Sequence, residues 1–386
     1  MKLNGSDIIA EVLIEQGVDT IFGYPGGAVL NIYDALYKYR DKIHHILTAH
    51  EQGASHAADG YARATGKTGV VIATSGPGAT NLVTGIATAY MDSIPMVAIT
   101  GNVGTSYIGK DAFQEVYITG ITMPITKHNF FVSDIKELAP TLREAFKIAN
   151  SGRKGPVLVD IPKDVTAAIT EYEKAAPEVI IDNTVINEDE VKKAAALINK
   201  AKRPVIEIGG GVVSSEASDL VRMLVNKTGA PCCHTLMAAG VLGFSEKLNY
   251  GLVGMHGSFV TNKAIDEADV LVAIGTRFSD RVALNTNRFA HKAKVIQIDI
   301  DLSEIDKNVK VDHALVGDVK TIVMDLLHYV KQSDRTDWLK TLDEYKKSDY
   351  HPVDSDKFIT PHQLIRAICE NVPKDTVYVT DVGQHQ

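Results

Sequence analysis

Residues 69–81 read GVVIATSGPGATN, a short apolar run that leads into a glycine-rich turn. The run GVVIA is rich in β-branched residues and has the length of a buried strand. The two glycines and the proline that follow predict a tight turn, and a helix can begin directly after them. A strand that passes into a helix through a short turn is the repeating step of a parallel sheet covered by helices.

The same step recurs along the first part of the chain. A helix that begins at Ser6, a good N-cap, and ends at Gly17 precedes the first strand. We predict an α/β domain over residues 1–168, with a parallel sheet between two layers of helices. Its other strand-like runs are TIFGYPG (20–26), HHILTAHE (44–51), PMVAITG (95–101) and GPVLVDIP (155–162).

The second part of the chain repeats this organisation. Residues 169–190 are acidic and without a clear period, which predicts a linker. A second three-layer domain with a parallel sheet is predicted over residues 191–345, ending in a surface helix. Residues 346–386 are predicted to be a connector, a helix (361–373) and a strand running into a turn (376–386), the start of a third domain. The strand-like runs of the second domain are RPVIEIGGGV (203–212), APCCHT (230–235), VLVAIG (270–275) and VIQIDID (295–301).

Composition excludes several classes of protein. The 386 residues are 45% hydrophobic and 23% charged, which is typical of a folded domain protein and not of a disordered chain. The formal net charge is −8 and no basic block occurs, so we expect neither nucleic acid nor a membrane as a partner. With three cysteines, no secretion signal and no long apolar run, the sequence favours a cytoplasmic protein.

Four local features could carry chemistry, and each also has a simple structural explanation. Glu51 stands where a strand gives way to a helix, and a carboxylate there complements the helix dipole without any other role. The turns SGPG (75–78) and FGYPGG (22–27) could present backbone amides to a polar ligand, or could simply be turns. The same choice holds for three glycines at 209–211, which could approach a diphosphate. The spacing of histidines and cysteines indicates no metal site.

Taken in order, the motifs resemble those of a known family, the catalytic large subunits of acetolactate (acetohydroxyacid) synthases, which depend on thiamine diphosphate. The resemblance covers essentially the whole chain. It implies a pyrimidine-binding domain, then a Rossmann-like FAD-binding middle domain, then a diphosphate-binding domain. The motifs are FGYPGG, HEQGA, TSGPGATN, IGKDAFQEV, ITKHNFFV, GPVLVDIPKDV, GGG, TLM, GMHGS, RFSDR, IDID and TDVGQHQ.

The resemblance also implies roles for individual residues. Glu51 matches the glutamate that protonates a ring nitrogen of thiamine diphosphate, while Gln114 and Lys127 match catalytic positions near a 2-keto acid. Gly27 and Phe113 match substrate positions, although Lys127 could be a solvated surface lysine and Phe113 a packing residue. The matches for thiamine diphosphate are Tyr24, Pro25, Gly26, Gly27, Ser75, Pro77, Gly78 and Asn81. The matches for FAD are Arg153, Gly209, Gly210, Gly211, Thr235, Leu236, Met237, Met255, His256, Arg277, Asp299 and Asp318.

The implied reaction decarboxylates pyruvate and joins the product to a second 2-keto acid, pyruvate or 2-ketobutyrate, in branched-chain amino acid biosynthesis. The resemblance implies a homodimer or higher oligomer and admits a regulatory small subunit. It also implies Mg²⁺ bound through a GDG motif and a later Asn. Gly317 and Asp318 continue instead as Val319, so we expect the diphosphate-binding domain to be absent and this chain alone to be inactive.

Two alternatives stay open at this stage. The chain could belong to another thiamine diphosphate enzyme, such as a pyruvate oxidase or a catabolic acetolactate synthase. It could also be a flavin-binding or dimerisation module without catalysis of its own.

Overall fold

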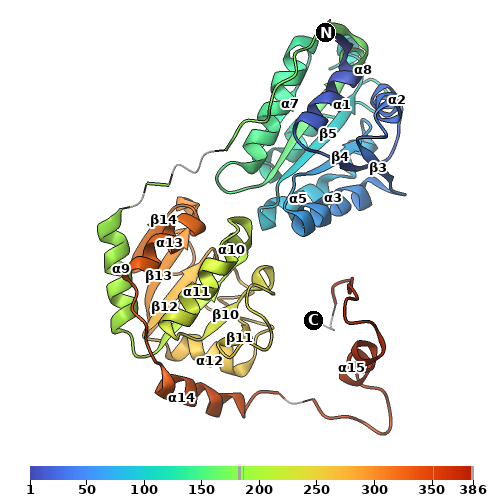
Figure 1. Ribbon diagram of the computed structural model, residues 1–386. Coiled ribbons are helices and arrows are strands. Elements are labelled where there is room, and N and C mark those ends of the chain that lie inside the picture. Colours follow the sequence, from blue (N-terminus) through green and yellow to red (C-terminus); the bar gives the residue numbers. More distant parts are fainter. Residues whose placement is uncertain (181–183, 186, 351, 384–386) are drawn as a thin grey trace. The chain divides into compact units, whose positions relative to one another are not determined.

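The structure is a computed structural model that describes residues 1–180, 184–185, 187–350 and 352–383 (Figure 1). The chain divides into two compact units, residues 1–182 and residues 183–386. Each unit is built on a six-stranded sheet, so the predicted α/β class with two parallel sheets is confirmed. Part of the expected linker (181–183 and 186) and the expected final turn (384–386) lie outside the described residues.

The sheet of unit 1 has the strand order β3-β2-β4-β5-β7-β6, and all its neighbouring strands are parallel. Every strand predicted for this part of the chain is present. The sixth strand, β6, was not predicted, because its sequence HNFF has no clear alternation of apolar and polar residues. The strands are β2 (Thr20–Gly23), β3 (His44–Leu47), β4 (Gly69–Ala73), β5 (Met96–Asn102), β6 (His128–Phe131) and β7 (Pro156–Pro162).

Helices cover both faces of this sheet, as a buried parallel sheet requires (Figure 1). On one face lie α1 (Gly5–Glu15), α2 (Leu30–Lys38) and α7 (Ile135–Asn150). On the other face lie α3 (Glu51–Thr65) and α5 (Val83–Asp92). The shorter elements are α4 (Pro77–Thr80), α6 (Ile118–Thr122), α8 (Lys163–Ala167) and the 3₁₀ turns η1 (Thr105–Tyr107) and η2 (Met123–Ile125).

The two ends of unit 1 differ from the sequence prediction. The N-cap of α1 is Asn4 and not Ser6, because the Asn4 side chain accepts a hydrogen bond of 2.8 Å from the backbone N–H of Asp7. Strand β1 (Lys2–Asn4) pairs antiparallel with β8 (Ile169–Glu171). Residues 169–171, which we expected in the linker, are therefore part of unit 1.

The sheet of unit 2 has the order β11-β10-β9-β12-β13-β14 and is also entirely parallel. The four predicted strands are β9, β10, β12 and β13. The structure adds an edge strand on each side, β11 and β14. The strands are β9 (Pro204–Ile208), β10 (Cys232–His234), β11 (Asn249–Leu252), β12 (Val270–Ile274), β13 (Lys294–Asp299) and β14 (His313–Val316).

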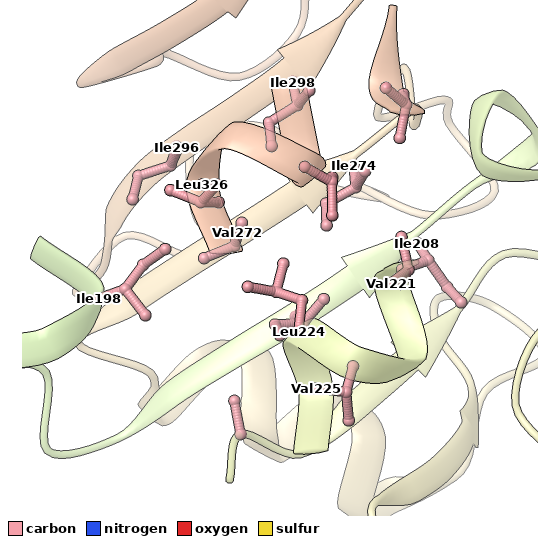
Figure 2. Close-up of a cluster of buried hydrophobic side chains, with 14 of the residues drawn as sticks. Ile198, Ile208, Val221, Leu224, Val225, Val272, Ile274, Ile296, Ile298 and Leu326 are labelled. Carbon is pink, nitrogen blue, oxygen red and sulfur yellow. The ribbon is translucent and has the colours of Figure 1, made fainter. Parts of the chain in front are cut away.

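The core of unit 2 lies on both faces of its sheet. Figure 2 shows one face, where isoleucine and valine side chains of β9, β12 and β13 meet leucine and valine side chains of the covering helices. These helices are α9 (Glu188–Lys200), α11 (Ser218–Thr228) and α13 (Val319–Tyr329). The other face is covered by α12 (Phe259–Glu267) and α14 (Thr336–Lys346). The shorter elements are α10 (Gly210–Ser214), η3 (Leu236–Ala238) and η4 (Leu302–Glu304).

Three predictions for unit 2 need correction. Helix α9 begins at Glu188, inside the expected linker, because the Asn187 side chain caps it. Helix α14, expected on the surface, buries Trp338 and Leu342 in the core. Helix α15 (Pro361–Asn371) forms as predicted, but residues 376–380 are not a strand. A strand needs a neighbour for its backbone groups, and no described strand pairs with these residues.

Replacing Leu224 by Ala tests the core drawn in Figure 2. Leu224 is fully buried on α11, so we expect a loss of about 2–5 kcal/mol in the free energy of unfolding. The neighbouring Met223 is 57% exposed, and Met223→Ala is expected to change that energy by less than about 0.5 kcal/mol. Urea unfolding of both variants measures the difference, and equal effects would contradict this core.

Candidate functional site

Each sheet has a point, between two neighbouring central strands, where the connections that follow these strands leave in opposite directions. In unit 1, β3 lies on one side of β2 and β4 on the other; in unit 2, β10 and β12 flank β9 in the same way. The loops that follow the two diverging strands leave a crevice at the carboxyl edge of such a sheet, where ligands bind in open α/β folds. The glycine turns after β2, β4 and β9 all lie at these switch points.

Glu51 is the first residue of α3 and lies at the carboxyl edge of unit 1. Its side chain is 9% exposed, and Glu51 Oε2 accepts a hydrogen bond of 2.9 Å from Asn81 Nδ2. Gly78 lies close against it, since a Cβ there would lie 3.3 Å from Glu51 Oε1 and 2.7 Å from Thr74 Cγ2. The helix is capped by His50, whose Nδ1 accepts from the Gln52 backbone N–H. A fixed carboxylate with a dedicated amide partner is more than a dipole-complementing residue needs.

The two glycine turns of unit 1 touch each other through Thr74. A Cβ at Gly26 would lie 2.5 Å from the Thr74 side chain, so only glycine fits there without a shift. The Ala28 backbone N–H donates a hydrogen bond of 3.1 Å to Thr74 Oγ1. The structure thus brings the turns 22–27 and 75–78 together. Sequence reasoning missed Thr74, although its position at the end of β4 was a usable signal.

Gln114 reaches the same place from the loop after β5. A Cβ at Gly76 would lie 2.8 Å from the Gln114 backbone oxygen, and Gly76 has a positive φ of 61°. The Glu115 carboxylate ties this loop by accepting hydrogen bonds from the backbone N–H groups of Gly109 and Ala112. Phe113 is 86% exposed, which does not agree with a packing role inside this unit.

Lys127 is not brought to this site. It precedes β6 and therefore lies at the amino edge of the parallel sheet, opposite Glu51. Its ammonium donates hydrogen bonds of 2.5 and 2.6 Å to the carbonyl oxygens of Ile148 and Ser151, at the end of α7. Burial lowers the pKa of Lys127 to about 8. This geometry fits a cap for α7 better than a substrate-binding group.

A different lysine, Lys163, lies at the carboxyl edge of the sheet, the same edge as Glu51. Lys163 comes directly after β7, as the first residue of α8, and its side chain is exposed. The next residue, Asp164, accepts hydrogen bonds from Thr105 N (3.0 Å) and Thr105 Oγ1 (2.5 Å) and so ties the β5 loop to α8. The signal in the sequence was the lysine immediately after the strand GPVLVDIP (155–162).

In unit 2, the three-glycine turn allows the ends of β9 and β12 to lie close together. A Cβ at Gly209 would lie 2.3 Å from the Gly275 oxygen, and one at Gly211 would lie 2.7 Å from the Gly275 Cα. The Gly211 backbone N–H donates a hydrogen bond of 3.1 Å to the Gly275 oxygen. Gly210 stands between them beside Met237. Side chains would separate β9 from β12 at their switch point.

Most other predicted flavin residues lie in loops at this carboxyl edge. Thr235 is fixed by a hydrogen bond of 2.9 Å from its backbone N–H to the Ile208 oxygen. The Met255 backbone N–H donates to the Arg281 oxygen, which joins the loop after β11 to the loop after β12. Asp299 ends β13 and accepts a hydrogen bond from Asp301 N. The remaining residues in these edge loops are Leu236, His256 and Arg277.

Two predicted flavin residues also have structural partners. The Asp318 side chain caps α13 by accepting hydrogen bonds from Lys320 N (2.9 Å) and Thr321 N (3.3 Å). Arg153 belongs to unit 1, where its Nε donates a hydrogen bond of 2.8 Å to Ser93 Oγ. It precedes β7 and so lies at the amino edge of that sheet.

Over the described ranges, no three side chains of the metal-ligating types converge. In the same part of the chain, no helix is both long and apolar enough to cross a bilayer.

Comparisons with known proteins agree with this geometry. Residues 3–121 match the family model described as thiamine pyrophosphate enzyme, N-terminal TPP binding domain. Residues 191–326 match the model for the thiamine pyrophosphate enzyme central domain. Over all of this chain, the sequence is 47% identical to a probable acetolactate synthase large subunit of Methanocaldococcus jannaschii, and it covers 67% of that protein.

The chain belongs to the acetolactate synthase large-subunit family of thiamine diphosphate enzymes.

Two further members of the family support this assignment. An acetolactate synthase of Mycobacterium leprae is 48% identical over the whole of this chain, which covers 63% of that protein. An acetolactate synthase large subunit of Lactococcus lactis is 43% identical over 99% of this chain, which covers 67% of it. The chain therefore spans about two thirds of the length of these acetolactate synthase relatives.

Replacing each of the two lysines by Met separates their roles in this acetolactate synthase family member. Lys127→Met removes the ammonium that donates to the Ile148 and Ser151 oxygens, although Ser151 Oγ still donates to the Ile148 oxygen, so we expect a loss of about 1–3 kcal/mol in the free energy of unfolding. Lys163→Met removes only an exposed ammonium and is expected to change that energy by less than about 0.5 kcal/mol. Denaturant unfolding measures both, and an unchanged Lys127→Met protein would contradict the capping role.

Proposed function

We propose that this chain carries the pyrimidine-binding and flavin-binding parts of an acetolactate synthase. The enzyme decarboxylates pyruvate and joins the two-carbon product to pyruvate or 2-ketobutyrate, giving 2-acetolactate or 2-aceto-2-hydroxybutyrate for isoleucine, valine and leucine synthesis. The observation that carries the proposal is Glu51, a nearly buried carboxylate held by Asn81 at the switch point of unit 1. Thiamine diphosphate, when bound, supplies the carbanion chemistry that no protein side chain provides.

The residues around Glu51 fit the pyrimidine half of that cofactor. Glu51 would share a proton with a ring nitrogen of the bound cofactor, and its hydrogen bond from Asn81 holds the carboxylate in one orientation. Gly78 has no side chain, so the backbone of this turn packs closely against Thr74 and Glu51 at the proposed ring site. The other residues proposed to contact the cofactor are Tyr24, Pro25, Gly26, Gly27, Ser75 and Pro77.

Substrate is proposed to enter from the same edge. A Cβ at Gly27 would meet no atom within 4 Å, so this turn faces open space on its outer side. Gln114 can hydrogen-bond a polar group of the 2-keto acid, and the exposed Phe113 ring can cover it. For the cation that attracts the substrate carboxylate we propose Lys163 instead of Lys127, because Lys127 is engaged at the amino edge.

Unit 2 is proposed to bind FAD at its own switch point. The glycine turn 209–211 lets a diphosphate approach the backbone amides, and Asp299, at the end of β13, can accept bonds from ribose hydroxyls. Leu236 and Met255 are exposed apolar side chains at this edge that an isoalloxazine ring could cover. In this proposal the flavin takes no redox part in the net reaction. The remaining proposed contacts are Thr235, Met237, His256, Arg277, Arg153 and Asp318.

The wider setting is part of the same proposal. Mg²⁺ would accompany the cofactor diphosphate, and none of the residues named here is assigned to it. A second copy of the chain is proposed to cover the exposed apolar side chains at the carboxyl edge of unit 1, among them Leu47, Phe113 and Tyr117. A regulatory small subunit is a further proposed partner. Free, buried thiols at Cys232 and Cys233 suit a reducing cytoplasm.

Glu51→Gln tests the catalytic assignment in an active acetolactate synthase that contains this sequence. Loss of the shared proton is expected to lower kcat for acetolactate formation by a factor of about 100 or more. Glu137→Gln is the matched control, because Glu137 also stands in the first turn of a helix, α7, and is exposed. If both variants lose activity equally, Glu51 has no catalytic role of its own and acts only as a first-turn carboxylate of its helix.

Arg277→Met tests the flavin site by titration of FAD fluorescence. Removing a cation beside the glycine turn is expected to weaken FAD binding by a factor of about 10 or more. Arg281→Met is the matched control, since Arg281 lies in the same RFSDR segment (277–281) and its side chain is 66% exposed. No quenching with the unmodified chain would contradict FAD binding by unit 2.

A further inference from the structure

A row of buried polar side chains crosses the sheet of unit 2 on the face covered by α12 and α14. Glu207 of β9, Ala273 of β12 and Gln297 of β13 are partners in register, with Cys233 of β10 next to Glu207. Glu207 and Gln297 are both 0% exposed. Ala273, which lies between them, is also 0% exposed. Polar side chains in such a place need hydrogen-bond partners.

This row lies directly beneath the proposed dinucleotide edge. Side chains on one face of a strand recur every second residue. Two residues beyond the row, the same face therefore carries Gly209, Gly275 and Asp299. The positions that the proposed function gives to the diphosphate and the ribose thus rest on the polar row.

Thr276 connects the row to that edge. Thr276 Oγ1 donates a hydrogen bond of 2.9 Å to Glu207 Oε1. Gln297 Nε2 donates to the Thr276 backbone oxygen at 3.3 Å. Thr276 is buried and stands between Gly275 and Arg277, so two strands hold the residue next to the proposed flavin contact.

Two oxygen atoms of this row have no hydrogen-bond donor. Glu207 Oε2 and Gln297 Oε1 are both buried without a hydrogen-bond partner. An ionised Glu207 offers only acceptors, whereas a neutral carboxylic acid also has an O–H group that can donate a hydrogen bond. One added proton would therefore remove the buried charge and give the unpartnered Glu207 oxygen a donor.

The groups around Glu207 do not supply a compensating positive charge. The titratable groups facing it from β10 are the thiols of Cys232 and Cys233, whose pKa values are raised by burial and by the Glu207 charge. Near Gln297, the Glu304 carboxylate is paired with Lys307 at 2.9 Å. The buried residues of α12 and α14 carry no charge, and the one polar residue among those of α12, Thr261, donates its hydroxyl to the Leu252 oxygen at 2.7 Å. Burial raises the pKa of Glu207 to about 7.

We propose that Glu207 is a positioning residue that is kept as a neutral acid, and that its hydrogen bond from Thr276 holds this residue and the neighbouring Arg277 in place for a dinucleotide. The inference rests on the proposed flavin-binding function of unit 2. Ionisation of Glu207 would place an unpaired negative charge in the core beneath the ends of β9 and β12. This charge would destabilise the segment of Thr276 and Arg277 that is proposed to contact the ligand. Binding of FAD is then weaker above the pKa of Glu207.

The direction of the pH effect follows from proton linkage. The folded chain binds the Glu207 proton more tightly than the unfolded chain, so stability falls as the pH rises from the ordinary glutamate pKa of about 4.5 to about 7. If only the neutral form binds FAD, affinity falls by at most about 30-fold between about pH 6 and about pH 8.5.

The first measurement needs no ligand. NMR of isotope-labelled glutamate side-chain carboxyl carbons, with E207Q to assign the signal, follows the protonation of Glu207 in the unmodified chain. We expect a midpoint near neutral pH. A midpoint in the ordinary range of an exposed glutamate would overturn the proposal.

The second measurement is FAD titration across the same pH range. E207Q keeps a neutral side chain with a donor and an acceptor, so it is expected to bind FAD as the unmodified chain does at about pH 6, without the decline at higher pH. E344Q, at an exposed residue of α14, is the control and should keep the decline. The same decline in E207Q overturns the positioning role. Absence of FAD binding in all three proteins overturns the flavin function, while the NMR midpoint still decides the protonation of Glu207.

Discussion

All strands of both six-stranded sheets run in one direction, and the rest of the structure depends on this constraint. Neighbouring parallel strands cannot be joined by a tight hairpin, so a helix must cross over one face between them. Both faces become buried, and every strand ends at the same edge. Residues scattered along the sequence, such as Gly27, Glu51 and Ser75, therefore meet at one edge of unit 1.

Backbone proximity at the switch points follows from the same constraint. At the point where β9 and β12 diverge, Gly209 and Gly211 lie against Gly275 so closely that no Cβ could be accommodated. In unit 1, Gly26 lies equally close to the Thr74 side chain. These glycines allow the strand ends to pack closely, and the proposed function uses the same turns to present backbone amides to a ligand.

Each sheet also buries an acidic residue close to its carboxyl edge. In unit 1, both Asp160 oxygens accept hydrogen bonds, from Thr100 and from Asn102, although burial raises the pKa of Asp160 to about 6. In unit 2, only one Glu207 oxygen has a partner. Hydrogen bonds to both oxygens account for the burial of Asp160. Glu207 has one unpartnered oxygen, and this is why we propose that it is protonated.

The sequence by itself determined the order of the central strands and of the helices between them, their approximate positions and, through the ordered motifs, the family, although the predicted runs 20–26 and 203–212 extend past β2 and β9. These signals are local, because apolar runs, caps and glycine turns depend on neighbours in the chain. The edge strands β6, β11 and β14 were not predicted, because strands that are only half buried have weaker patterns of apolar residues. Tertiary structure alone decided that Lys127 lies opposite Glu51, that Lys163 lies on the same edge, and that Glu207 lies beneath the glycine turn. Strand order and register set these distances, and both arise from contacts between residues far apart in the sequence.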